Sequence, residues 1–236
     1  MTNQPNRTEG LPADPVPADR AGDIMRRMHD QFHAEKPFWR GKLHLIALCV
    51  AIPAVVALLW AADGGMVRLA AGVYGASVIG LFAASSAYHL LGRTSETRQW
   101  LRKLEHSMIF VLIAGTYTPI TLAIGGRVGW GVFATVWTMA ALGIAATFRF
   151  WGRYRLLHVA FYVATGWSIV IAWTPVVAVF STEMFGWVLA GGVTYTIGAV
   201  VYSIKRLPFN HAIWHLFVLG GSACFFVGIY RNILLM

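Results

Sequence analysis

Acidic side chains are scarce in most of this chain. Only Asp63, Glu96, Glu105 and Glu183 follow the first long apolar run, and the other six acidic residues precede it. Charged residues of either sign make up 12% of the sequence, against 57% hydrophobic ones. Because an average soluble domain carries about 25% charged residues, the composition places this chain in the membrane class.

Cysteine is equally scarce. Cys49 and Cys224 are the only two, and both fall inside apolar runs, so we expect no disulfide framework. Basic residues are in excess, with a formal net charge of +9, but no basic stripe with interleaved aromatic residues appears. We therefore expect no nucleic-acid binding. We interpret the positive charge as an indication of which membrane loops face the cytoplasm.

A signal peptide is not recognisable in the first 41 residues, which are polar and rich in proline and lack a short apolar core with a small-residue cleavage site. We expect residues 1–41 to form a disordered cytoplasmic tail. Within it, residues 24–39 can form a short amphipathic helix on the membrane surface. His29 and His33 are four residues apart there, and we interpret them as a solvated surface pair.

Long apolar runs dominate the rest of the sequence. A run of about twenty apolar residues is long enough to cross the ~30 Å hydrocarbon core of a bilayer as a helix. Short segments connect these runs, so we predict an all-α bundle of seven transmembrane helices over residues 42–236. Their expected ranges are 43–62, 66–91, 106–124, 129–148, 156–180, 185–204 and 211–235.

Lysine and arginine determine the predicted orientation, because short cytoplasmic loops carry an excess of both. They gather before the first expected helix and then in every second connection. The opposite side holds only Arg68, Arg127 and Arg231. We therefore predict a cytoplasmic N-terminus, seven crossings and a C-terminus outside.

Ionisable residues inside membrane helices are functional candidates, and this orientation brings several to one depth near the cytoplasm. They lie at the end of the second helix and at the start of the third and seventh. Residues four apart share a helical face, so each such pair can point inward together. The candidates are Ser85, His89, Glu105, His106, His211 and His215.

This combination of side chains suits a metal site. Three neutral imidazoles are a sufficient protein shell for a catalytic zinc ion with water as its fourth ligand. Zinc can lower the pKa of that water to about 7, and a nearby carboxylate can orient the water or take its proton. Each residue alone also has a structural interpretation: a histidine near a helix end reaches the headgroups, and a helix N-terminus favours an anion such as Glu105.

The shared depth makes the metal interpretation the favoured one for the set, but not for every histidine. We keep the structural interpretation for His44 and His158, which also lie near cytoplasmic helix starts. His106 projects about 100° away from Glu105 around the helix, so we expect it to face a neighbouring helix or lipid. In the GTYTP stretch, residues 115–119, Pro119 frees a backbone carbonyl and favours a bend that threonine and tyrosine hydroxyls can repair; lining of a lipid cavity is the lesser interpretation.

Three ordered motifs carry a family resemblance: SSAYH at 85–89, LEHSMIFVLIAGTYTP at 104–119 and NHAIWHLFVLGG at 210–221. They resemble the hemolysin III branch of the progestin and adipoQ receptor family, from about residue 40 to the last helix. The resemblance implies that His89, His211 and His215 bind zinc and that Glu105 holds the zinc-bound water molecule. The family usually has aspartate at that position, one methylene shorter.

The same resemblance bears on the remaining residues and on function. It implies that Ser85, with Ser86 as the alternative, supports the site or polarises a carbonyl group. Related alkaline ceramidases suggest a zinc-dependent hydrolase of a lipid amide or ester in a bacterial inner membrane, with membrane lipids as partners. The alternative is a non-enzymatic sensor or regulator of membrane lipid state with structural zinc. A pore-forming hemolysin ranks below both, because no polar stripe is present to line a wide channel.

Overall fold

Helices account for every regular element in the part of the chain that the structure describes. The computed structural model describes the backbone of residues 37–204, 206–207 and 209–232. Seven segments there are long and apolar enough to cross a membrane, which confirms the predicted seven-helix bundle. Residues 1–36, which hold most of the predicted tail and surface helix, lie outside the described residues, whereas residues 37–41 of the predicted tail belong to the first helix. The helices are α2 (Pro37–Ala61), α3 (Gly65–Leu91), α4 (Ser95–Ile124), α5 (Gly126–Arg149), α6 (Arg155–Gly166), the 3₁₀ helix η1 (Trp167–Ala172), α7 (Trp173–Val179), α8 (Thr182–Ser203) and α9 (Asn210–Asn232).

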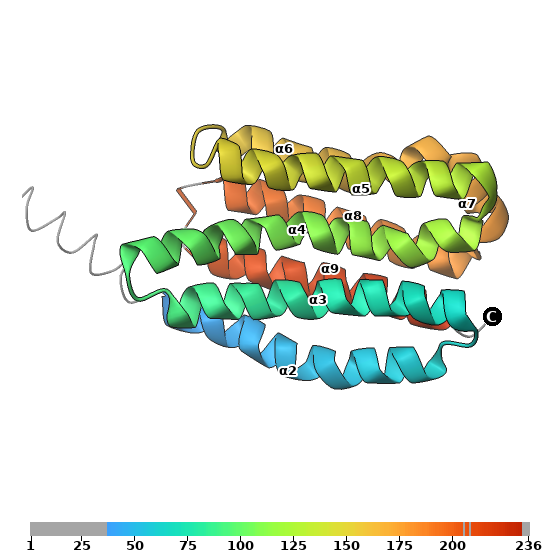
Figure 1. The fold of residues 1–236 in the computed structure, drawn as a ribbon, viewed down its shortest axis with the longest axis horizontal. Helices are drawn as coiled ribbons and strands as arrows, with labels where there is room; N and C mark the ends of the chain where they lie inside the picture. The colour runs from blue at the N-terminus through green and yellow to red at the C-terminus, as the bar shows by residue number, and fades with distance from the viewer. Residues whose placement is uncertain (1–36, 205, 208, 233–236) are drawn as a thin grey trace, which may run out of the picture. The chain divides into compact units, whose positions relative to one another are not determined.

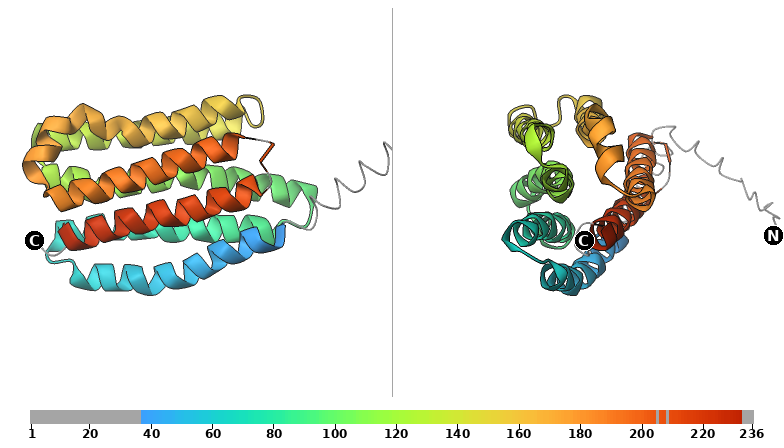
Figure 2. Two further views of the ribbon diagram at one scale, coloured as in Figure 1. Left: turned by 180° about the vertical axis from the view of Figure 1, so that it is seen from behind. Right: turned by 90° about the vertical axis from the view of Figure 1, so that its right-hand side faces the viewer.

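Within this helical unit, consecutive helices pack side by side and the ring closes where α9 lies against α2 (Figures 1 and 2). The chain runs up and down between the two ends of the bundle. As a result the beginnings of α2, α4 and α9 and the end of α3 share one end. These are the four segments that carry the candidate histidines and Glu105.

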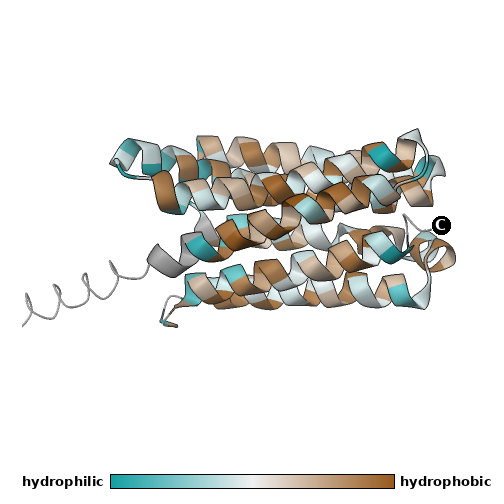
Figure 3. Ribbon diagram, turned by 90° about the horizontal axis from the view of Figure 1, so that it is seen from below, coloured by the Kyte–Doolittle hydropathy of each residue, from teal (hydrophilic) through white to brown (hydrophobic). Residues whose placement is uncertain are grey.

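Apolar side chains face outward as well as inward, as expected of a protein whose surroundings are lipid. On α2, for example, Ile46, Val50 and Val56 are exposed. Figure 3 shows hydrophobic residues along the middle of the helices and most of the hydrophilic ones nearer the ends. The exposed apolar belt therefore has the distribution that a bilayer-spanning bundle requires.

Helix α4 begins earlier than predicted, at Ser95 rather than near residue 106. The side chain of Thr94 caps it by accepting a hydrogen bond from the backbone N–H of Thr97 at 3.2 Å. The polar run 95–105 is thus helical although it is not apolar. Glu105 consequently lies almost three turns inside α4, so the interpretation that a helix N-terminus stabilises its charge is wrong.

The fifth predicted helix is not continuous. Helix α6 ends at Gly166, a 3₁₀ turn follows, and α7 resumes at Trp173. The hydroxyl of Tyr117, on α4, donates to the Gly166 carbonyl at 2.7 Å and accepts from the Ile169 N–H at 2.7 Å. The tyrosine of GTYTP therefore satisfies backbone groups at the break in a neighbouring helix rather than in its own.

Candidate metal centre

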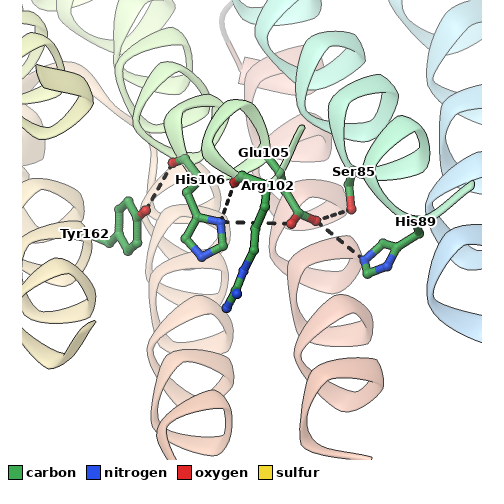
Figure 4. Close-up of polar contacts among 6 residues, drawn as sticks. All are labelled: Ser85, His89, Arg102, Glu105, His106 and Tyr162. Atoms are coloured by element: carbon green, nitrogen blue, oxygen red, sulfur yellow. Dashed lines mark hydrogen bonds and ion pairs between the residues drawn. The ribbon is translucent and has the colours of Figure 1, made fainter. Parts of the chain in front are cut away.

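Glu105, on α4, lies at the centre of a cluster of polar residues from several helices. It is buried, and its Oε1 accepts a hydrogen bond of 2.5 Å from the hydroxyl of Ser85 on α3 (Figure 4). Ser85 is fully buried. A hydrogen bond from a buried hydroxyl fixes the orientation of the carboxylate and stabilises its charged form, which an apolar bundle would otherwise disfavour.

His89 follows Ser85 by one turn of α3 and lies near the same carboxylate. Its Nε2 is 3.7 Å from Oε1 of Glu105, and its side chain is 7% exposed. This confirms that the serine and histidine of SSAYH point inward from one helical face, as Figure 4 shows. His215 reaches the cluster from α9: its ring lies perpendicular to that of His89, with centroids 5.3 Å apart.

His44 on α2 is a further candidate ligand, which the sequence prediction does not include. Its ring centroid is 4.1 Å from that of His215, and the residue is 2% exposed. One ligand atom each from His44, Glu105 and His215 lies within 4.8 Å of the others. The sequence favours a structural role for His44, and that interpretation stays open; α2 begins at the same end of the bundle as α4 and α9, so the depth argument extends to His44.

His211 lies one turn before His215 but is turned differently. Its Nδ1 is 2.7 Å from Oδ1 of Asn210, and its ring packs against Tyr202 at 5.1 Å. The Asn210 amide donates to the carbonyls of Ile204 at 3.2 Å and Tyr202 at 3.4 Å, so Oδ1 is its accepting end. Nδ1 of His211 therefore carries a proton, which leaves Nε2 as its candidate metal-binding atom.

His106 faces a neighbouring segment, in agreement with the prediction. Its Nδ1 donates to the Arg102 carbonyl at 2.9 Å and lies 4.0 Å from Oε2 of Glu105. Its ring packs edge-on against Trp151, in the connection between α5 and α6, at 5.2 Å. The hydroxyl of Tyr162 donates to the His106 carbonyl at 3.1 Å. These contacts join α4 to α6 beside the cluster (Figure 4).

The donor set of this cluster fits a metal ion. Imidazole nitrogens with one carboxylate are the ligands that zinc prefers, and three such groups with an open position are typical of catalytic zinc sites. Both ring nitrogens of His44 are buried. Since a buried polar atom is stabilised by a bonding partner, a cation in the cluster would bind a nitrogen of His44 and offset the charge of Glu105.

A cavity of about 430 Å³ opens beside the cluster. It lies within the range of about 300–1,000 Å³ that small-molecule sites occupy. Its walls combine the polar cluster with apolar and aromatic side chains, and they extend to the helix break at Gly166 and Trp167. Thr116 and Tyr117 line it as well. The histidines and the carboxylate that line the cavity are those of His44, His89, Glu105, His106, His158, His211 and His215.

Comparison with known proteins gives consistent matches over most of the chain. A family model described as "Haemolysin-III related" matches residues 32–226. "Hemolysin-3 homolog" of Bacillus subtilis is 38% identical over 187 residues, 78% of this chain and 87% of that protein. "Hemolysin-3" of Bacillus cereus is also 38% identical over 187 residues, 78% and 85%. Human "Monocyte to macrophage differentiation factor" is 30% identical over 192 residues, 76% and 78%.

Proposed function

Because the chain belongs to the haemolysin-III-related family, within the progestin and adipoQ receptors, we propose that it is a zinc-dependent hydrolase. Its proposed substrate is a lipid amide or ester, attacked from the cytoplasmic side of a bacterial inner membrane. The observation that carries the proposal is the position of the buried His44–Glu105–His215 group at the wall of a largely apolar cavity. A lipid carbonyl in this cavity would lie beside the candidate metal ligands.

His89 and His215 are the proposed histidine ligands that the sequence motifs and the observed proximity both support. His211, the third ligand that the family resemblance implies, has Nε2 as its candidate metal-binding atom and lines the same cavity. His44 is an additional candidate from the geometry. When bound, zinc supplies an activated water molecule and a Lewis acid that polarises the scissile carbonyl.

Glu105 is the proposed acid–base group. Its carboxylate would take the proton of the attacking water and return it to the leaving nitrogen or oxygen, a role that contributes about 10²–10⁴-fold to rates. Ser85 has one hydroxyl proton, and that proton is already donated to Glu105 at 2.5 Å. This supports a role for Ser85 in orienting the carboxylate rather than in polarising a lipid carbonyl.

A regulatory role with structural zinc is the second candidate, and one observation favours it. His44, Glu105 and His215 form one group, and His89 lies beside Glu105, so four candidate protein ligands surround the site. Four protein ligands complete a tetrahedral zinc shell and leave no position for water. Pore formation, which the names of the Bacillus relatives suggest, ranks below both.

Replacing Glu105 by glutamine separates the first two candidates. The change Glu105→Gln preserves size and hydrogen bonding but removes the base. For a hydrolase, zinc remains bound while release of fatty acid from native lipid mixtures falls by about 10²–10⁴-fold. His89→Ala serves as a metal-site control. Equal release by the wild type and both variants would eliminate the enzymatic proposal and leave the regulator.

A further inference from the structure

Arg102 lies beside the candidate metal centre, but the proposed chemistry gives it no role. It precedes Glu105 by one turn of α4, about 4.5 Å along the helix axis, and lines the same cavity. Its guanidinium carbon is 5.5 Å from the centre of the Trp151 ring. In Figure 4 its side chain runs past His106, with the guanidinium directed away from the carboxylate of Glu105.

The guanidinium of Arg102 lies over the ring of Trp151. An arginine over an indole face gains cation–π attraction, which limits the orientations the side chain samples. The same ring also contacts the ring of His106, with centroids 5.2 Å apart. A guanidinium that lies over an aromatic ring keeps its N–H donors, and these can bind an oxyanion with two parallel hydrogen bonds.

The protein provides no such anion among the residues that the structure describes. The ion pairs found there involve Glu105 and Glu183 as the acids, and neither pairs with Arg102 within 4.0 Å. General attraction to membrane headgroups would explain an arginine on the outer surface, such as the exposed Arg98 one turn earlier. It does not explain one that lies over an aromatic ring and lines the cavity that contains the candidate metal ligands.

We propose that Arg102 binds an oxyanion of the lipid that occupies the cavity, so that acidic lipids are preferred over lipids without an anionic group. This inference rests on the proposed function for the identity of the occupant as a lipid. The oxyanion is a phosphodiester headgroup or the carboxylate of a released fatty acid. In a glycerophospholipid the phosphate lies only a few bonds from the ester carbonyls. One molecule can therefore place its phosphate at Arg102 and an ester carbonyl at the metal centre.

The test measures binding rather than turnover. Full-length protein with its metal is titrated in detergent with phosphatidylglycerol, oleic acid and diacylglycerol of matched chains, and native mass spectrometry gives each dissociation constant. We expect Arg102→Gln to weaken binding of at least one of the two anionic lipids tenfold or more and to leave diacylglycerol unchanged. Which anionic lipid is affected identifies the source of the oxyanion.

Two variants and one composition measurement make the result specific. Arg98→Gln removes an equal charge from the same helix outside the cavity and leaves all three constants unchanged, whereas Arg102→Lys gives intermediate binding because it keeps the charge but loses the planar fork. Zinc content equal to wild type shows that the Arg102 variants are folded. Equal weakening by Arg98→Gln and Arg102→Gln, equal weakening for all three lipids, or no weakening for either anion would overturn the inference. A lack of hydrolysis would refute the proposed function and leave these binding results unaffected.

Discussion

Tyr117→Phe removes one oxygen atom from a buried side chain and tests how the broken helix is held. That oxygen donates to the Gly166 carbonyl and accepts from the Ile169 N–H, both at 2.7 Å. The two partners are backbone groups in a membrane-spanning segment, where the loss of a hydrogen-bond partner is costly. The ring itself stays, so the packing of the aromatic side chain is retained.

Two estimates bracket the cost. Interhelical hydrogen bonds in membrane proteins average about 0.6 kcal/mol, so two of them give about 1 kcal/mol. Stranded backbone groups cost about 1–3 kcal/mol each, which gives about 2–6 kcal/mol. The lower figure applies if η1 rewinds so that Ile169 finds a carbonyl one turn earlier, and the upper applies if the break persists. Since an aromatic ring at position 117 occupies the space beside the break in both proteins, we expect a loss of at least about 2 kcal/mol.

The assay is reversible unfolding in detergent, followed by tryptophan fluorescence, together with hydrogen exchange of the Ile169 amide. Tyr230→Phe is the matched control, because the Tyr230 ring stacks on Phe226 and its hydroxyl makes no hydrogen bond to another described residue. We expect that control within about 0.5 kcal/mol of wild type. A Tyr117→Phe protein as stable as the control, with unchanged Ile169 exchange, would refute the assignment of the hydroxyl to the break.

Two further predictions concern the metal centre. His44→Ala is expected to lower zinc affinity, measured by competition with a chelator, because His44 lies within the candidate ligand group; His158→Ala, which alters a cavity residue outside that group, leaves affinity unchanged, and equal affinity in both variants would show that His44 is structural. Asn210→Ala is expected to lower zinc affinity by about 10–100-fold, since it removes the acceptor that sets the tautomer of His211. Asn210→Asp keeps an acceptor and retains the metal, and a loss of zinc in both Asn210 variants would contradict the tautomer argument.

The seven helices were predictable because length and apolarity decide membrane insertion. Hydropathy does not show that a polar segment is helical. It also does not show where a membrane-spanning helix is interrupted. Residues 95–105 read as a loop by composition, yet the Thr94 cap starts α4 there. The break in the fifth span lies at Gly166 and Trp167, and its backbone groups bond to a hydroxyl from a different helix.

The candidate site was predictable in part, for a related reason. Helical spacing and orientation brought Ser85, His89 and Glu105 to one depth, and the structure brings them into contact. Rotation about a helix axis is set by packing between helices, which spacing does not reveal. The ring orientation of His211, set by Asn210, and the inward position of His44 therefore required the structure.

Zinc content is the most direct test of a metal centre at this end of the bundle. His215 belongs both to the ligand set implied by the sequence motifs and to the group defined by the geometry. Elemental analysis of purified wild-type protein is predicted to give one zinc ion per chain, and His215→Ala protein of equal folded fraction to give far less. A wild type without stoichiometric metal, or a His215→Ala variant that retains all of it, would contradict the account.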